Sequence, residues 1–143
     1  WDIYKDIPKI FSRLDIQGNL FLISDTNVYS LYGQEVEKYI ASTGKQVFSH
    51  ELEPGEHNKT FDAISNIYRW LAESKAQRRD TIVALGGGVV GDMAGFVAAT
   101  YNRGLGFIQI PTSLAAMVDA SVGGKTAVDL PEGKNLVGAF YQP

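Results

Sequence analysis

The sequence contains no cysteine, which excludes a disulfide framework, a cysteine-ligated zinc ribbon and a catalytic thiol. Histidine is also scarce. His50 and His57 are the only two, and no His-Glu-x-x-His or comparable pair is present to ligate a metal. The absence of cysteine is compatible with a reducing compartment, and we expect a cytoplasmic location.

Strong charge and long apolar runs are missing as well. The formal net charge of −3 over 143 residues predicts no binding surface for nucleic acid or for an anionic membrane. The apolar stretches are too short to cross a bilayer. With 45% hydrophobic residues, the chain can bury a sizeable core, so we expect one globular domain.

Charge and glycine are unevenly spread along the chain. Residues 93–143 hold only six of the 29 charged side chains, but 11 of the 15 glycines lie at Gly86 or later. A glycine-rich half with little charge indicates backbone packed closely against a ligand or another domain. The chain begins with Trp1 rather than methionine, and we expect it to be a fragment of a longer protein.

Apolar runs alternate with helical stripes, which predicts an α/β domain with a mostly parallel, Rossmann-like sheet and flanking helices. Ligands of such sheets bind beyond the carboxyl ends of the strands, so the segments after the four strands should form one rim. The expected strands are 19–24, 46–52, 81–85 and 107–110; the expected helices cover 28–40, 61–71, 88–99 and 112–120; two further β-like pieces lie within 125–142.

The segment Gly86-x-Gly88-x-x-Gly91 follows a predicted strand and opens a predicted helix, where free backbone amides can hold a pyrophosphate. An ordinary dinucleotide fingerprint also needs an acidic residue about 20 positions on, but residues 93–118 contain none. Asp25 is the candidate to bind a ribose instead. The alternative is a glycine turn that only packs the helix on the sheet. In that case Asp92 would simply interact favourably with the dipole at the start of the helix.

Gly123-Gly124-Lys125-Thr126 looks like the end of a nucleotide-binding P-loop, but residue 119, where the first glycine should stand, is an aspartate. A carboxylate there would repel phosphate, and the preceding segment is helix-like rather than a strand. We therefore reject the P-loop. Asp119, Lys125 and the pair Lys134-Asn135 remain as candidate ligand contacts, or as ordinary charges on a solvated hairpin.

Four motifs in order closely resemble the 3-dehydroquinate synthase family: residues 86–92 (GGGVVGD), 111–114 (PTSL), 119–126 (DASVGGKT) and 133–138 (GKNLVG). The resemblance extends from Asp25 to Pro143. It implies an N-terminal NAD-binding α/β domain followed by a helical domain, in which one glutamate and two histidines hold zinc or cobalt. We expect residues 1–143 to be the NAD-binding domain alone, inactive without the second domain, and the whole protein to be a homodimer.

The resemblance also implies roles for individual residues. The cofactor contacts would be Asp25, Thr26, Asn27, Glu56, Lys59, Gly87, Gly88, Val89, Asp92, Thr112, Ser113 and Lys134. The substrate contacts would be Arg103, Asp119, Lys125 and Asn135. Cations and amide donors suit a phosphate, and the carboxylate of Asp119 suits a ring hydroxyl.

The activity implied by the family is conversion of 3-deoxy-D-arabino-heptulosonate 7-phosphate, a small sugar-acid phosphate, to 3-dehydroquinate and phosphate in the shikimate pathway. NAD is regenerated in each turnover. Other sugar-phosphate cyclases, which make inosose or valiolone rings, share these motifs. Metal-dependent polyol dehydrogenases share the fold but would accumulate NADH. A further alternative is a non-catalytic nucleotide-binding module.

Overall fold

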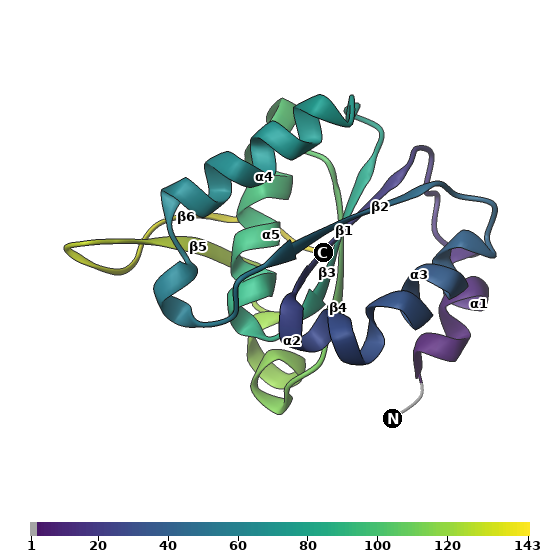
Figure 1. Cartoon of the computed structure of the whole chain (residues 1–143), viewed down its shortest axis with the longest axis horizontal. Coiled ribbons are helices and arrows are strands. Elements are labelled where there is room, and N and C mark those ends of the chain that lie inside the picture. The colour runs from purple at the N-terminus through teal and green to yellow at the C-terminus, as the bar shows by residue number, and fades with distance from the viewer. Residues whose placement is uncertain (1–2) are drawn as a thin grey trace.

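A four-stranded parallel sheet organises the computed structural model, which describes residues 3–143 (Figure 1). Its strands are neighbours in the order β2-β1-β3-β4. The two inner strands are largely apolar and are buried along their length except at Asp25, the last residue of β1, as expected of a parallel sheet covered on both faces. The bounds are β1 Leu20–Asp25, β2 Val47–Leu52, β3 Thr81–Gly86 and β4 Gly106–Pro111.

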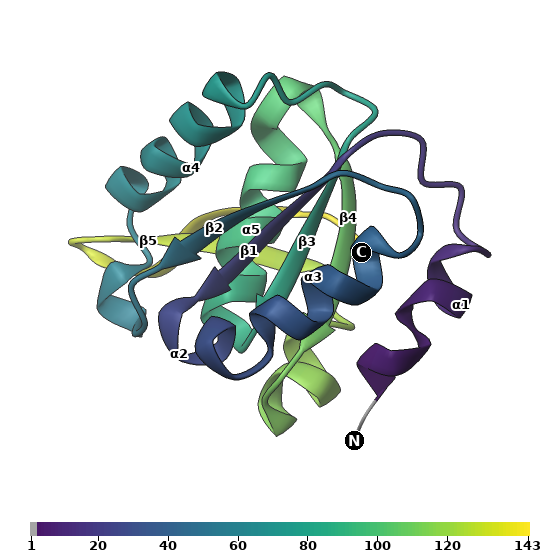
Figure 2. The ribbon, with the colours of Figure 1, turned by 45° about the vertical axis from the view of Figure 1, so that its right-hand side comes forward.

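Helices cover both faces of this sheet (Figure 2). One core cluster joins the sheet to α4 (Phe61–Glu73) and α5 (Gly88–Thr100), and the other joins it to α1 (Ile7–Phe11) and α3 (Gln34–Ala41). The predicted α/β architecture is therefore confirmed. Shorter helical segments are η1 Ile3–Asp6, α2 Thr26–Val28, η2 Tyr29–Gly33, η3 Glu56–Asn58, η4 Tyr101–Arg103 and η5 Ala116–Ala120.

The helix predicted over residues 28–40 is interrupted by the π-helical segment η2. Val36 and Ile40 are buried as the apolar stripe predicts, but Leu31 and Tyr32 are exposed, so the stripe was wrong at these two positions. A π turn holds one more residue than an α turn, and this rotates the side chains within η2 off the face that α-helical spacing predicts.

The last two strands, β5 (Lys125–Leu130) and β6 (Gly133–Phe140), form an antiparallel hairpin outside the main sheet. Figure 1 shows it beside α5 and extending away from the body of the domain. The hairpin packs on α5, where a Cβ atom on Gly95 would overlap Thr126 and would lie 3.0 Å from the Phe107 ring. Val128 of β5 is fully buried in the core cluster of α4 and α5.

Chain order places the topological switch point between β1 and β3, since β2 lies to one side of β1 while β3 and β4 lie to the other. The segments after β1 and β3 are therefore adjacent at the carboxyl edge, where ligands of such sheets bind. The helix α5 starts at this edge. No helix among residues 3–143 has both the length and the apolar character needed to cross a membrane.

Candidate functional site

The segments that follow β1, β3 and β4 come together at the switch point, as the sequence predicts. The Ser24 hydroxyl donates to the Leu85 carbonyl at 2.7 Å, and this bond ties the ends of β1 and β3. The Thr112 amide donates to the Gly86 carbonyl at 2.9 Å, which holds the segment after β4 beside the glycine loop. Asp25 caps α2, since its Oδ1 accepts the Val28 amide at 3.0 Å. Thr26 and Asn27 form the first turn of that short helix.

The glycines of the loop divide into two kinds. Gly86 is required by packing, because a Cβ atom there would lie 2.7 Å from Cβ of Val90. At Gly91 a Cβ would lie 3.0 Å from Oε1 of Gln109, so this side chain would have to shift. At Gly87 and Gly88 a Cβ would meet only ordinary contacts, 3.6 Å to Ser113 and 3.8 Å to Ala120.

Backbone strain does not require glycine at Gly87 or Gly88 either. Gly87 has φ −79° and ψ −167°, which any residue adopts, and Gly88 is the first residue of α5. Neither packing nor backbone conformation therefore requires glycine at these two positions. Without side chains they leave the start of α5 open to close approach by another molecule.

The same place offers backbone donors. The first hydrogen bond of α5 runs from the Gly91 amide to the Gly87 carbonyl at 3.0 Å. The amides of Gly88, Val89 and Val90 precede it and have no partner within the helix. The capping residue is a glycine with no side chain to occupy them, and α5 is 13 residues long. The start of this helix can therefore hold an anion.

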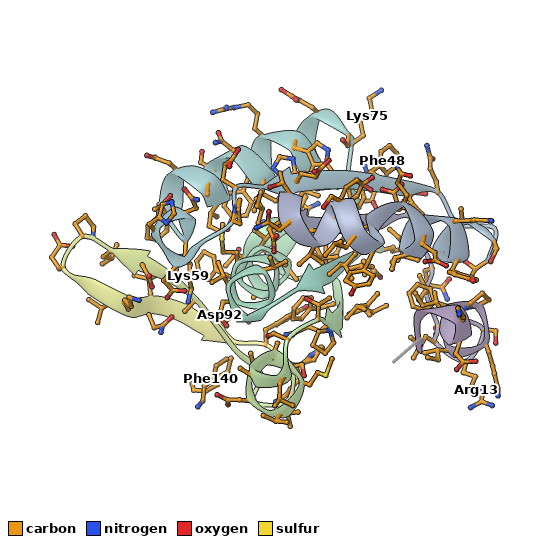
Figure 3. All side chains as sticks on the ribbon, turned by 60° about the horizontal axis from the view of Figure 1, so that its bottom comes forward. Arg13, Phe48, Lys59, Lys75, Asp92 and Phe140 are labelled. Atoms are coloured by element: carbon orange, nitrogen blue, oxygen red, sulfur yellow. The ribbon has the colours of Figure 1, made fainter. Side chains whose placement is uncertain are left out.

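A buried lysine lies beside this loop. Lys59 follows η3 and is 1% exposed. Its ammonium donates to Oδ2 of Asp92 at 2.6 Å and to Oδ1 of Asn135 at 2.5 Å. Glu56 and Asp129 each place a carboxylate oxygen 4.0 Å from it. Figure 3 shows Lys59 and Asp92 facing each other between the hairpin and α5.

Asp92 lies in the second turn of α5, and its carboxylate pairs with Lys59 rather than with the start of the helix. Burial raises the pKa of Asp92 above its ordinary value, and the neighbouring Glu56 and Asp129 raise it further. The hydrogen bond and charge of Lys59 act in the opposite direction. Lys59 thus favours the ionised form of a carboxylate that its surroundings would tend to protonate.

Four predicted contacts line one pocket of about 520 Å³: Asp92, Asp119, Lys125 and Asn135. Asp92 comes from α5, Asp119 from η5, and the other two from the hairpin, so the pocket joins three elements distant in sequence. The turn that precedes β5 is fixed by the Val122 and Gly123 amides, which each donate to the Asp119 carbonyl at 3.0 Å. Lys125 begins a strand rather than a helix, which confirms that this segment is no P-loop.

Lys134 and Glu56 line a neighbouring pocket of about 550 Å³, together with Asp129. The Lys134 ammonium lies 3.7 Å from Oε1 of Glu56 and is 70% exposed. Arg103 is not brought to either pocket. It follows the far end of α5, about 20 Å from the glycine loop by the rise of the helix.

The sequence analysis missed Asp129. Its amide donates to the Lys59 carbonyl at 2.9 Å, and its Oδ1 accepts the Asn135 amide at 2.8 Å. The available signal was an acidic residue within an otherwise apolar strand, Ala127 to Leu130. The sequence also gave no sign that the Lys59 side chain would be buried.

The two histidines lie away from these pockets or on their rim. His50 stacks on Trp70 with ring centroids 4.9 Å apart, and burial lowers its pKa. His57 is exposed beside Asn58 and borders the pocket of Glu56 and Lys134. Among residues 3–143 no three His, Asp or Glu side chains are grouped so as to hold a metal ion.

Comparison with known proteins identifies a family. The family model described as 3-dehydroquinate synthase N-terminal matches residues 49–143. A 3-dehydroquinate synthase from Clostridium acetobutylicum is 52% identical over 141 residues, which is 99% of this chain and 40% of that protein. The chain thus spans about two fifths of the length of this relative.

Solved structures of similar fold include a 2-deoxy-scyllo-inosose synthase complexed with carbaglucose-6-phosphate, NAD+ and Co2+. It has a TM-score of 0.90 and 32% identity, covering 96% of this chain and 38% of its own. A 2-epi-5-epi-valiolone synthase from Streptomyces hygroscopicus subsp. jinggangensis with NAD+ and Zn2+ bound has a TM-score of 0.79 and 30% identity. That match covers 87% of this chain and 34% of the synthase.

Proposed function

Because this chain belongs to the 3-dehydroquinate synthase family, we propose that residues 1–143 form the NAD-binding domain of an enzyme that converts 3-deoxy-D-arabino-heptulosonate 7-phosphate to 3-dehydroquinate and phosphate. The observation that carries the proposal is the pocket shared by Asp92, Asp119, Lys125 and Asn135, beside a helix start that has amide donors and no side chains.

The geometry at Gly87 and Gly88 fits the pyrophosphate of NAD. A Cβ at either residue would fit the fold but would fill the space above the first amides of α5, where the diphosphate would lie. Asp25, at the adjoining end of β1, uses one carboxylate oxygen to cap α2. The other oxygen remains to accept from a ribose hydroxyl.

The pocket beside the loop fits a polyhydroxylated phosphate. Lys125 supplies an exposed ammonium for the phosphate, and Asp119 supplies an exposed carboxylate that can accept from a hydroxyl. Asn135 can direct its amide nitrogen to the same ligand, because its Oδ1 is already held by Lys59. These residues would bind and orient the sugar while Asp92 forms the wall next to the nucleotide loop.

When bound, NAD supplies a hydride acceptor that is restored within the turnover, and a divalent metal such as zinc or cobalt supplies a Lewis acid. We place the metal ligands in the part of the relatives that this chain does not span. Residues 1–143 alone should then bind NAD without catalysis.

The decisive experiment measures phosphate release from 3-deoxy-D-arabino-heptulosonate 7-phosphate by the full-length protein, with and without a chelator. We expect release that needs catalytic NAD, stops with the chelator and leaves no net NADH. Titration of NAD into residues 1–143 by calorimetry tests the nucleotide site separately. No phosphate release, with NAD binding retained, would leave another sugar-phosphate cyclase or a nucleotide-binding module as the alternatives.

A second candidate is another NAD-dependent sugar-phosphate cyclase, favoured by the 2-deoxy-scyllo-inosose and valiolone synthases among the similar structures. The proposed synthase and the alternative cyclases differ in the substrate that they consume. The full-length protein should be offered the seven-carbon acid phosphate, glucose 6-phosphate and sedoheptulose 7-phosphate in parallel. Turnover of either of the last two in preference to the first would replace the proposed activity.

We also propose that the whole protein is a homodimer. Arg103 lies one helix length from the pocket of its own chain, so a second copy is the natural way for it to reach a bound phosphate. At substrate concentrations well below the raised KM of the variants, mixing Arg103→Ala and Lys125→Ala proteins should restore part of the activity, since mixed dimers would contain one intact site. Sedimentation of the full-length protein as a monomer would overturn this arrangement.

A further inference from the structure

Asp129 leaves the regular pairing of its own hairpin. The register between β5 and β6 shifts between Val128 and Leu130, so Asp129 stands at an irregularity of the ladder. Its amide donates instead to the carbonyl of Lys59 at 2.9 Å. Bulges of this kind redirect a side chain away from the alternation of the strand. The main chain at Asp129 therefore joins the hairpin to the segment that carries the buried lysine.

The carboxylate of Asp129 holds Asn135 across the hairpin. Its Oδ1 accepts the Asn135 amide at 2.8 Å. Asn135 has a φ of +56°, in the left-handed region that residues with a Cβ seldom adopt. In this conformation Oδ1 of Asn135 reaches the Lys59 ammonium at 2.5 Å. The bond to Asp129 thus holds the amide of a residue in a left-handed backbone conformation.

The charge on Asp129 faces the same lysine. Its Oδ1 lies 4.0 Å from the Lys59 ammonium, and its side chain is 15% exposed. The only other acid of the hairpin, Glu132, lies exposed in the turn between the strands. Asp129 therefore contacts both Asn135, which lines the pocket, and Lys59, which pairs with Asp92 on the opposite wall.

We propose that Asp129 is a positioning residue: it accepts the Asn135 amide, fixes the left-handed turn there, and so sets the direction of the Asn135 side chain at the sugar-phosphate pocket. Asp129 does not touch the ligand itself in this scheme. The inference rests on the proposed function for its effect on substrate, but its structural part concerns the Asn135 amide and can be measured without any substrate.

The first experiment follows hydrogen exchange of the Asn135 amide by NMR in residues 1–143. Asp129→Ala should speed this exchange by about tenfold or more, because the amide loses its acceptor. Asp129→Asn keeps a carbonyl oxygen at the same place and should stay within about threefold of wild type. Glu132→Ala, which removes an acid from the same hairpin, is the matched control and should leave the exchange unchanged.

The second experiment measures steady-state kinetics of the full-length protein. Asp129→Ala should raise KM for the sugar phosphate by about tenfold while kcat changes less than about threefold, as expected when ground-state and transition-state binding are lost together. Asp129→Asn should restore most of the wild-type KM. If Asp129→Ala does not fold, Asp129→Ser takes its place as a milder change. Its hydroxyl is too short to reach the Asn135 amide, so it should raise KM in the same direction.

The results separate this inference from the proposed function. Wild-type protein that consumes no seven-carbon acid phosphate would overturn the proposed function, whereas the exchange measurement would still decide whether Asp129 holds Asn135. An active wild type whose Asp129→Ala and Asp129→Ser variants keep both the Asn135 protection and the KM would overturn the positioning role. Equal losses in Asp129→Asn and Asp129→Ala would also overturn it, because the acceptor would then not be the group that matters.

Discussion

The ammonium of Lys59 lies 2.6 Å from Oδ2 of Asp92, and this pair joins the segment after β2 to the second turn of α5 (Figure 3). Lys59 is nearly completely buried, whereas Asp92 keeps 22% of its side chain exposed toward the pocket. The cation is therefore a structural partner inside the fold, and its carboxylate partner forms part of the candidate site.

Replacing Lys59 with methionine should destabilise the chain by about 3–5 kcal/mol. The substitution removes one member of a buried ion pair and leaves Asp92 and Asn135 without their common hydrogen-bond donor. Urea unfolding of residues 1–143 measures it. Lys134→Met is the matched control, because this ammonium is 70% exposed and 3.7 Å from Glu56, and it should cost less than about 1 kcal/mol. Equal costs would contradict the role given to Lys59.

The same substitution should raise the pKa of Asp92. Burial already raises this pKa, and Lys59 is the group that lowers it. Because the folded-state pKa is above the ordinary value, the folded chain binds the proton more tightly. The contribution of Asp92 to stability is then greatest at low pH and is lost as pH rises through the folded pKa. In Lys59→Met the folded-state pKa of Asp92 should be higher still, so this contribution to stability should be lost at a higher pH than in the wild type. Carboxyl carbon chemical shifts of Asp92, followed by NMR in both proteins, test this directly; an unchanged midpoint would refute it.

The fold followed closely from the sequence because the central strands are largely apolar runs, α4 carries one apolar stripe, and α5 is a run of small and apolar residues after a glycine loop. The four-strand parallel sheet and the hairpin were predicted from these patterns. The π-helical turn at Tyr29–Gly33 was not, because a single extra residue in a turn leaves no mark on the composition around it. Leu31 and Tyr32 were consequently placed on the wrong face.

The candidate site was predictable where glycines and charged residues have an unusual spacing. It was less predictable where it depends on contacts between residues distant in sequence. The spacing of the glycines in residues 86–91 predicts a ligand-binding loop. The sequence does not show that packing requires glycine at Gly86 but not at Gly88. The contact between Asn135 and Lys59 spans 76 positions, and only the docking of the hairpin on α5 brings them together. Arg103 shows the opposite limit: a motif match cannot reveal that a whole helix separates it from the other predicted contacts.

Gly88→Ala should weaken NAD binding while leaving stability nearly unchanged. A Cβ there would lie 3.8 Å from Ala120, an ordinary contact, and alanine is favoured over glycine within a helix. The methyl group would instead occupy the space over the first amides of α5, so we expect a rise in Kd of about tenfold or more by calorimetry. Gly95→Ala is the control with the opposite expectation. Its Cβ would overlap Thr126, so this variant should lose folding stability rather than NAD affinity in the folded protein. Unaltered NAD affinity in folded Gly88→Ala protein would remove the main support for the nucleotide cradle.

His50 should make the stability of the chain fall on mild acidification. Burial against Trp70 lowers its pKa below 6.5, so the unfolded chain binds this proton more readily than the folded one. Stability therefore rises with pH between the lowered pKa and 6.5, and is lost as pH falls through that window. His50→Phe keeps an aromatic ring beside Trp70 without a titrating group, and its stability should vary less between about pH 5 and pH 7. Urea unfolding at several pH values measures both proteins. His50→Asn should show the same flattening at lower overall stability, and an undiminished slope in both variants would assign the effect to another group.

Lys125→Ala should weaken binding of the phosphate-bearing substrate in the full-length protein. The exposed ammonium lines the same pocket as Asp119 and Asn135, and loss of a charged hydrogen bond to phosphate costs about 1.5–3 kcal/mol, which corresponds to roughly 10- to 150-fold in KM. NAD affinity should stay close to wild type if Lys125 serves the substrate alone. Lys38→Ala is the control for loss of charge, because Lys38 is an exposed lysine on α3 that lines none of these pockets. A variant with unaltered KM and kcat would exclude Lys125 from the substrate site, whereas a parallel loss of NAD affinity would reassign it to the cofactor.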